Sequence, residues 1–211
     1  ALTVAAVRAA GIEMSEKDLS RLARRGSGSA ARSIPAGYVE WYRGEADADS
    51  YALTIAPPEH WGLVDCVAMV DSGAKKVGSS DGHRLAETSP LQSARIADSP
   101  RRLELCRTAI QQQDFTLLAE IIELDSNLLH AIAFTSTPTI LYWLPATISI
   151  MQEVQELRRT GTPCAFTIDA GPNVHVICPV TSAITVQEKL RAITGVSAVL
   201  MSGAGEGAHL V

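Results

Sequence analysis

Several features are missing from this sequence, and each absence excludes a class of protein. The four cysteines of the 211 residues are widely spaced and form no C-x-x-C pair, so neither a disulfide framework nor a metal site is expected. The net charge is −5 and the isoelectric point is about 5.5, which argues against a nucleic-acid binder with a broad basic surface. No apolar run approaches the roughly 18 residues that span a bilayer, so no membrane partner is expected.

The first residues, "ALTVAAVRAAGIEM", also lack two signals. They have neither the basic start nor the cleavage site of a signal peptide, which together with the unpaired cysteines favours a reducing cytosol. They begin without methionine, and their apolar spacing predicts a helix over residues 1–11 with no capping residue before it. We therefore expect an N-terminal portion of the protein to lie outside this sequence.

The residues that are present predict an α+β protein with two layers. Hydrophobic residues make up 46% of the chain, enough to bury a full core. Strand-like patterns occur at residues 37–44, 63–71, 164–171 and 173–179, and apolar residues at three- and four-residue spacing predict helices through residues 85–160. Residues 45–61 are predicted as a polar, proline-bearing connection, and residues 203–211 as a glycine-rich exit with a short final strand.

The segment "GSGSAARS" at residues 26–33 follows a run of arginines and is the first candidate site. Successive N–H groups of a glycine-rich turn that leads into a helix can hold an anion, and the hydroxyls of Ser27 and Ser29 add donors. Arg32 lies one turn beyond Ser29, where its guanidinium can bind a carboxylate or phosphate with two hydrogen bonds. The alternative is a helix end followed by a flexible turn and a solvated basic face.

The segment "FTIDAGPN" at residues 166–173 places Asp169 between a strand and a tight turn. A carboxylate on such rigid backbone suits a general base or an orienting group. The alternative is an Asx turn, which is common before Gly-Pro.

Two further segments combine polar residues in patterns that indicate a functional site less specifically than the first two do. "KKVGSSDG" at residues 75–82 offers the hydroxyls of Ser79 and Ser80 to a phosphate, although an ordinary surface turn explains it equally simply. "ELDSNLLHA" places Ser126 and His130 four residues apart on one helix face, near Asp125. An interior polar contact explains that spacing better than a catalytic triad does.

Taken together, these segments resemble the diphosphomevalonate decarboxylases of the GHMP kinase superfamily. The family carries GSGSACRS before G-[YF]-V-x-W, and this chain has "GSGSAARS" before "GYVEW". The family's K-K-x-S-S-x-x-G-M before T-S corresponds to "KKVGSSDGH" before "ETSP". Its helix E-x-[DN]-S-x-x-[ML]-H-A corresponds to "ELDSNLLHA", and its [FY]-T-x-D-A-G-P-N to "FTIDAGPN". The four motifs follow the family's order and cover most of the chain.

The resemblance implies a fold and a reaction. It implies a GHMP-kinase-like architecture, with residues 1–83 the remainder of an S5-like N-terminal domain and residues 84–211 a ferredoxin-like C-terminal domain. Family members use ATP and Mg²⁺ to phosphorylate the 3-hydroxyl of mevalonate 5-diphosphate, after which phosphate and CO₂ leave and isopentenyl diphosphate forms. The resemblance also implies a small anionic substrate, a homodimer and a cytoplasmic enzyme.

The resemblance assigns roles to individual residues. Asp169 matches the catalytic aspartate, and Arg32 matches the arginine that holds the substrate carboxylate. Ser79 matches a serine of the catalytic set. The diphosphate-binding segment and its neighbours correspond to Ser27, Gly28, Ser29, Arg32, Ser79 and Ser80.

Several departures from the family leave alternatives open. Gly78 replaces a serine, His83 a methionine and Ala31 a cysteine, and Ser80 stands where some members place an arginine that reaches the substrate phosphates. A phosphomevalonate decarboxylase or a mevalonate kinase-type activity on the same scaffold is therefore an alternative. The family's ATP phosphate loop is absent from this sequence, so we expect this chain alone to be inactive. A non-catalytic anion-binding module is a second alternative.

Overall fold

The structure is a computed structural model that describes residues 1–71, 73 and 78–210, without the side chains of Ser79 and Ser80. Contacts divide the chain into two compact units. The first comprises Ala1–Gly62 with the described residues from Gly203 onward, and the second comprises Leu63–Ser202. Lys75 and Lys76, which the sequence places beside the two serines, lie outside the described residues.

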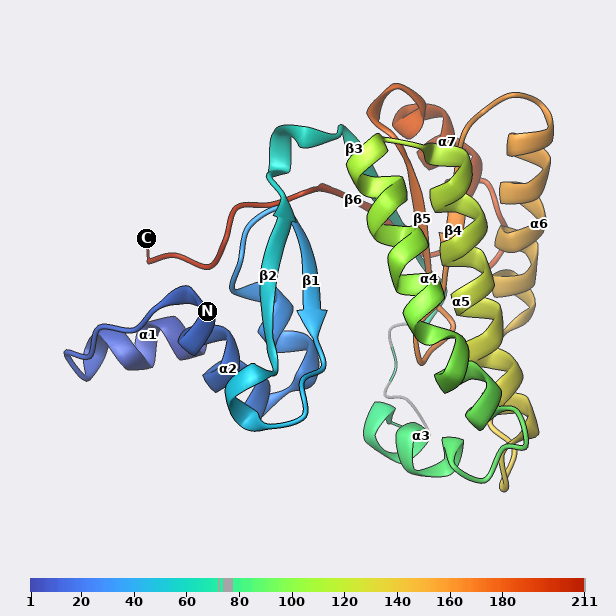
Figure 1. The fold of residues 1–211 in the computed structure, drawn as a ribbon. Helices are drawn as coiled ribbons and strands as arrows, with labels where there is room; N and C mark the ends of the chain where they lie inside the picture. The colour runs from blue at the N-terminus through green and yellow to red at the C-terminus, as the bar shows by residue number, and fades with distance from the viewer. Residues whose placement is uncertain (72, 74–77, 211) are drawn as a thin grey trace. The chain divides into compact units, whose positions relative to one another are not determined.

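In the first unit, α2 packs against a two-stranded hairpin and α1 packs against α2 (Figure 1). Its elements are α1 (Leu2–Ala9), α2 (Glu16–Gly26), the 3₁₀ turn η1 (Gly28–Ser33), β1 (Tyr38–Tyr42), η2 (Asp47–Asp49), β2 (Tyr51–Ala56) and η3 (Pro58–His60). The Ser15 side chain caps α2 by accepting a hydrogen bond from the amide of Asp18 (3.1 Å). The C-terminal tail joins this unit, because the Ala208 amide donates to the carbonyl of Ile34 (2.9 Å).

The second unit is a four-stranded sheet with strand order β4-β5-β3-β6, packed with helices (Figure 1). Its elements are β3 (Leu63–Met69), α3 (Ser79–Ala86), α4 (Gln92–Gln112), α5 (Phe115–Thr135), α6 (Pro145–Arg159), β4 (Ala165–Thr167), β5 (Val174–Pro179), η4 (Val180–Ser182), α7 (Ala183–Arg191) and β6 (Ala198–Gly203). Strand β5 pairs antiparallel with both β3 and β4. The core lies between the sheet and helices α6 and α7, with Ile150, Val154, Val186 and Leu190 fully buried.

The α+β class and the two strands on either side of residues 171–173 are confirmed, and three predicted segments are wrong. Residues 79–86 form helix α3, where the sequence suggests a surface turn. Residues 51–56 form β2 rather than a connection, because β1 supplies an antiparallel partner, with Ala52 opposite Trp41 and Ala56 opposite Tyr38. Ala52 and Ala56 are both buried. The expected final strand is not found in the part of the chain described after Gly203.

The boundary between the two compact units also differs from the expected division at residue 83. Strand β3 pairs with β5 and so belongs with the second unit, whereas the residues after Gly203 pack with the first. The assignment of residues 1–83 and 84–211 to two family domains stays a prediction. Among the described residues, no helix has the length and apolar character needed to cross a membrane.

Candidate active site

In the first unit, the candidate anion site is the turn between α2 and β1. Ser27 is extended at the end of α2, and residues Gly28–Ser33 then form a 3₁₀ turn. The hydroxyls of Ser27 and Ser29 lie 3.0 Å apart, both on exposed residues. Ser27, Gly28, Ser29 and Arg32 thus lie on one short turn or at its start, and their role in binding an anion stays a prediction.

Packing under this turn explains two of its small residues. A Cβ atom at Gly28 would lie 2.9 Å from the ring of Trp41, so only glycine fits there without a shift. Ala31 is fully buried, and its carbonyl accepts a hydrogen bond from the hydroxyl of Ser20 (3.0 Å). The same hydroxyl accepts from the amide of Ala52 (2.9 Å), so Ser20 ties the turn to β2.

The arginines around the turn differ in their partners. Arg21 pairs with Asp18 and Asp47, each at 2.8 Å, and Arg24 also pairs with Asp47. Arg32 is exposed and has no acidic partner within the part of the chain that the structure describes. Arg21 and Arg24 thus help to hold α2 to η2, and Arg32 is available for an external anion.

In the second unit, the candidate catalytic group is Asp169, which is exposed just after β4. The loop around it is fixed at both ends by buried polar side chains. On the N-terminal side, the Ile168 amide donates to the hydroxyl of Ser126 (2.9 Å), and the Ile168 carbonyl lies 3.2 Å from Nε2 of His130.

On the C-terminal side of the loop, the hydroxyl of Thr147 donates to the carbonyl of Pro172 (2.7 Å). The side-chain oxygen of Asn173 accepts from the amides of Val70 (2.8 Å) and Asp71 (3.0 Å). The loop thus holds an exposed carboxylate on backbone that is anchored on each side, an arrangement that suits proton transfer.

Two histidines near the loop have opposite electrostatic surroundings. Burial is the largest influence on His130 and lowers its pKa below the ordinary value, although the Ile168 carbonyl and Asp169 act in the other direction. The pKa of His175 is raised, chiefly because its Nδ1 lies 2.7 Å from a carboxylate oxygen of Asp65. Near neutral pH the ring of His130 is therefore uncharged.

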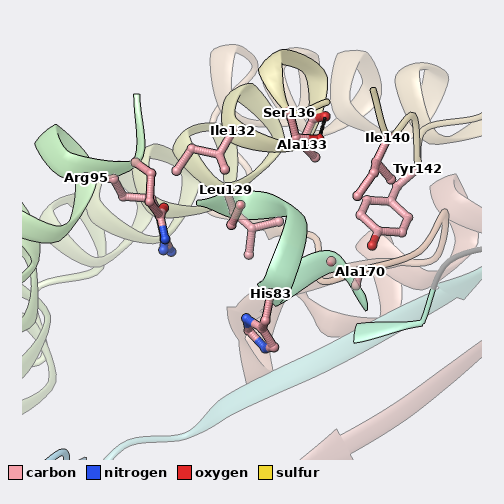
Figure 2. Close-up of a pocket in the computed structure, with 12 residues that line it drawn as sticks. His83, Arg95, Leu129, Ile132, Ala133, Ser136, Ile140, Tyr142 and Ala170 are labelled. Atoms are coloured by element: carbon pink, nitrogen blue, oxygen red, sulfur yellow. Dashed lines mark hydrogen bonds between the residues drawn. The ribbon is translucent and has the colours of Figure 1, made fainter. Parts of the chain in front are cut away.

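Helix α3 lies beside the Asp169 loop and carries the remaining predicted residues. Gly82 and His83 of α3 and Ala170 of the loop line one cavity of about 170 Å³, whose opposite wall is α5 (Figure 2). Ser79 and Ser80 occupy the first turn of this helix, one turn before Gly82. A Cβ atom at Gly82 would lie 2.9 Å from the hydroxyl of Tyr142, so glycine allows this close approach.

The sequence predicts only part of the anchoring of the Asp169 loop. Ser126 and His130 are confirmed as interior polar contacts, but their shared partner, Ile168, lies 42 and 38 residues away. The sequence around Thr147 does not predict its contact with the loop, because the only local feature is the position of Thr147 near the start of a helix. The proline after Gly171 did mark the turn, and only the fold shows that Asn173 closes it.

Two family models match the chain. The model described as "Mevalonate 5-diphosphate decarboxylase C-terminal domain" matches residues 66–204. The model described as "Diphosphomevalonate decarboxylase-like N-terminal domain" matches residues 1–52.

Curated relatives agree with these models. The chain is 38% identical over 191 residues to a diphosphomevalonate decarboxylase of Aspergillus fumigatus, a match that covers 87% of this chain and 47% of the relative. It is 40% identical over 168 residues to the diphosphomevalonate decarboxylase of Homo sapiens, covering 76% and 42%. The chain thus spans about half the length of the curated relatives it matches.

Solved structures share the fold. A structure of MDDEF in complex with MVAPP, AMPPCP and magnesium aligns with a TM-score of 0.91 and 36% identity, covering 98% of this chain and 64% of that one. Mevalonate diphosphate decarboxylase from Staphylococcus aureus aligns with a TM-score of 0.85 and 35% identity, covering 92% and 60%.

Proposed function

The chain belongs to the diphosphomevalonate decarboxylase family, and on that basis we propose that the protein carrying it converts mevalonate 5-diphosphate to isopentenyl diphosphate. The reaction consumes ATP and releases ADP, phosphate and CO₂ in the mevalonate pathway of isoprenoid synthesis. The substrate is a small polyanion, which accounts for an exposed arginine at a glycine–serine turn in an acidic chain.

Each candidate residue has a role in this proposal. Asp169 accepts the proton of the tertiary 3-hydroxyl while the hydroxyl oxygen attacks the terminal phosphorus of ATP. Arg32 holds the substrate carboxylate with two hydrogen bonds. When phosphate leaves, the electron pair of the carboxylate C–C bond forms the double bond, and CO₂ departs. Ser27, Gly28, Ser29, Ser79 and Ser80 supply donors to the phosphates and, at Ser79, to the reacting centre.

One observation carries the proposal. Asp169 is exposed while the residue before it, Ile168, is 1% exposed and bonded through both its amide and its carbonyl. An ordinary Asx turn at the surface does not require buried side chains of a helix such as α5 to anchor its backbone. An exposed carboxylate on immobile backbone is what a general base needs, because its distance to the substrate proton must be kept.

The substitution Asp169→Ala tests this role. In the protein that carries this chain, it should lower kcat by roughly 100-fold or more, because general-base catalysis typically contributes about 10² to 10⁴. Substrate affinity, measured by calorimetry, should change little. The matched control is Glu188→Ala, which removes an exposed carboxylate from α7 of the same unit and should retain full turnover. Substantial turnover by Asp169→Ala would remove Asp169 from the mechanism.

ATP and Mg²⁺ enter the proposal through the relatives, one of whose structures contains AMPPCP and magnesium. The described residues of this chain include no group of three or more histidine, cysteine or acidic side chains that could hold a metal ion. We therefore assign no step to a metal held by this chain. ATP serves as the phosphoryl donor in the protein that carries it.

A second candidate is decarboxylation of mevalonate 5-phosphate. It is favoured by Gly78 and Ser80, which stand at positions where the family has a serine and, in some members, an arginine that reaches the substrate phosphates. Loss of such contacts suits a substrate with one phosphate fewer. Kinase-type activity is a weaker candidate because phosphorylation alone does not need the carboxylate holder Arg32. A non-catalytic role is weaker because it does not need the anchored Asp169. Homodimer formation and a cytoplasmic location are part of the proposal on the family resemblance alone.

A further inference from the structure

Helix α5 runs along the outer edge of β4, the edge strand of the second sheet. One side of an edge strand lacks a neighbouring strand, and the backbone groups of residues two apart point toward that open side. On α5, Glu123, Ser126 and His130 are spaced by three and four residues and therefore share one face. Their side chains bond the backbone of β4 and of the residue after it.

The contacts form a ladder that ends at the residue before Asp169. The Phe166 amide donates to Oε1 of Glu123 (3.2 Å), and the Ile168 amide donates to the hydroxyl of Ser126 (2.9 Å). The same hydroxyl donates to the Ile168 carbonyl (3.3 Å), and Nε2 of His130 lies 3.2 Å from that carbonyl.

The chemistry of these groups determines the form of the histidine ring. A carbonyl oxygen only accepts hydrogen bonds, so Nε2 of His130 carries a proton and donates. Burial lowers the pKa of this ring, which is therefore neutral and leaves Nδ1 without a proton. Nδ1 is buried and has no hydrogen-bond partner among the described residues.

This arrangement costs stability, since Ser126 is 3% exposed, His130 is fully buried, and one ring nitrogen is unpaired. An apolar residue in place of His130 would avoid that cost. What the two polar side chains achieve together is to fix both the amide and the carbonyl of Ile168, and hence the direction in which the chain enters Asp169.

We propose that Ser126 and His130 are positioning residues that hold the Asp169 carboxylate at its working distance from the substrate. The inference rests on the proposed role of Asp169 as the base. Glu123 supports the same strand one step further from the carboxylate, so its influence on turnover is smaller.

The kinetic test compares Ser126→Ala, His130→Leu and His130→Gln in the protein that carries this chain. The first two should lower kcat by about 10- to 100-fold with KM within about twofold, because a displacement of about 1 Å can cost a catalytic group about 100-fold. His130→Gln should recover most of the loss, since its amide nitrogen can replace the Nε2 donor. Glu123→Gln should lower kcat less than Ser126→Ala.

The control for lost stability is Val186→Ala, which opens a cavity in the core from α7 and removes none of the side chains that form the ladder. It should lower the unfolding midpoint and leave kcat unchanged. The inference is overturned if kcat falls in Val186→Ala as much as in Ser126→Ala, or if His130→Gln is no better than His130→Leu.

A second readout does not depend on turnover. Nitrogen NMR of the His130 ring in this chain should show protonated Nε2 and unprotonated Nδ1, and Ser126→Ala should speed hydrogen exchange at the Ile168 amide by at least tenfold. The opposite ring form, or unchanged exchange, overturns the inference. If the unmodified protein releases no CO₂ from any mevalonate derivative while these NMR results hold, the proposed function fails and the positioning of Asp169 by α5 stands.

Discussion

Arg32 differs from its neighbours Arg21 and Arg24 in having no acidic partner among the described residues. Arg32→Ala should therefore leave the fold unchanged and lower kcat/KM for decarboxylation by about 10- to 100-fold, the value of a hydrogen-bonded contact to a charged group. CO₂ release is the measurement. Arg43→Ala is the control, because it removes the same charge from an exposed position in the same unit. Near-normal CO₂ release by Arg32→Ala would exclude Arg32 from the site.

The two histidines near the Asp169 loop should contribute to stability with opposite dependences on pH. The pKa of His130 is lowered by burial. The contribution of this ring to the free energy of unfolding is therefore present above the ordinary pKa of about 6.5 and is lost as pH falls below that value. The pKa of His175 is raised by Asp65, so its contribution is present below about 6.5 and is lost as pH rises through the folded-state pKa.

Proton NMR should resolve these two titrations, with His175 deprotonating at a higher pH than His130. As pH rises above about 6.5, denaturation of His175→Gln should show a smaller loss of stability than denaturation of the unmodified chain does. If the two rings titrate together near their ordinary value, the Asp65 contact and the burial of His130 do not have the electrostatic effect described.

Helix α6 contributes to the site through its first turn. Thr147 is fully buried, accepts from the amide of Leu144 (3.2 Å) and donates to the carbonyl of Pro172 (2.7 Å). Thr147→Val keeps the shape and removes both bonds, so it should lower the free energy of unfolding by about 1–3 kcal/mol. Urea denaturation measures this loss. Ile148→Val, at the next and exposed position, should cost far less, and an equal loss in both variants would contradict the anchoring role of Thr147.

Local patterns predicted the long helices α4 to α6 and the strands β4 and β5, because those elements carry their signals in consecutive residues. Helix α3 was missed, since its glycines and serines suggested a surface turn. Strand β2 was missed, since acidic residues before it and two prolines after it suggested a connection, and only pairing with β1 defines it. Asp169 and Arg32 were found by motif. Ser126 and His130 were recognised as interior polar residues, but their partner Ile168 was not, and the contact of Thr147 with Pro172 was missed altogether. These contacts join residues that are 25 to 42 positions apart.

The candidate residues are divided between the two compact units of the chain. The glycine–serine turn and Arg32 belong to the first, and Asp169 and α3 belong to the second. A decarboxylase needs the carboxylate holder and the base to act on one substrate molecule. The chain spans about half the length of its curated relatives. Turnover should therefore be measured in the protein that carries this chain.

The most direct measurement of the central claim is CO₂ release by that protein with MgATP and, in parallel, mevalonate, its 5-phosphate and its 5-diphosphate. The account predicts release from the diphosphate with one ADP formed per CO₂. Release from the monophosphate alone would support the second candidate, decarboxylation of mevalonate 5-phosphate. Ser80 would then be the next residue to substitute in a test of substrate specificity. ADP formation without CO₂, or no turnover with any of the three, would contradict the account.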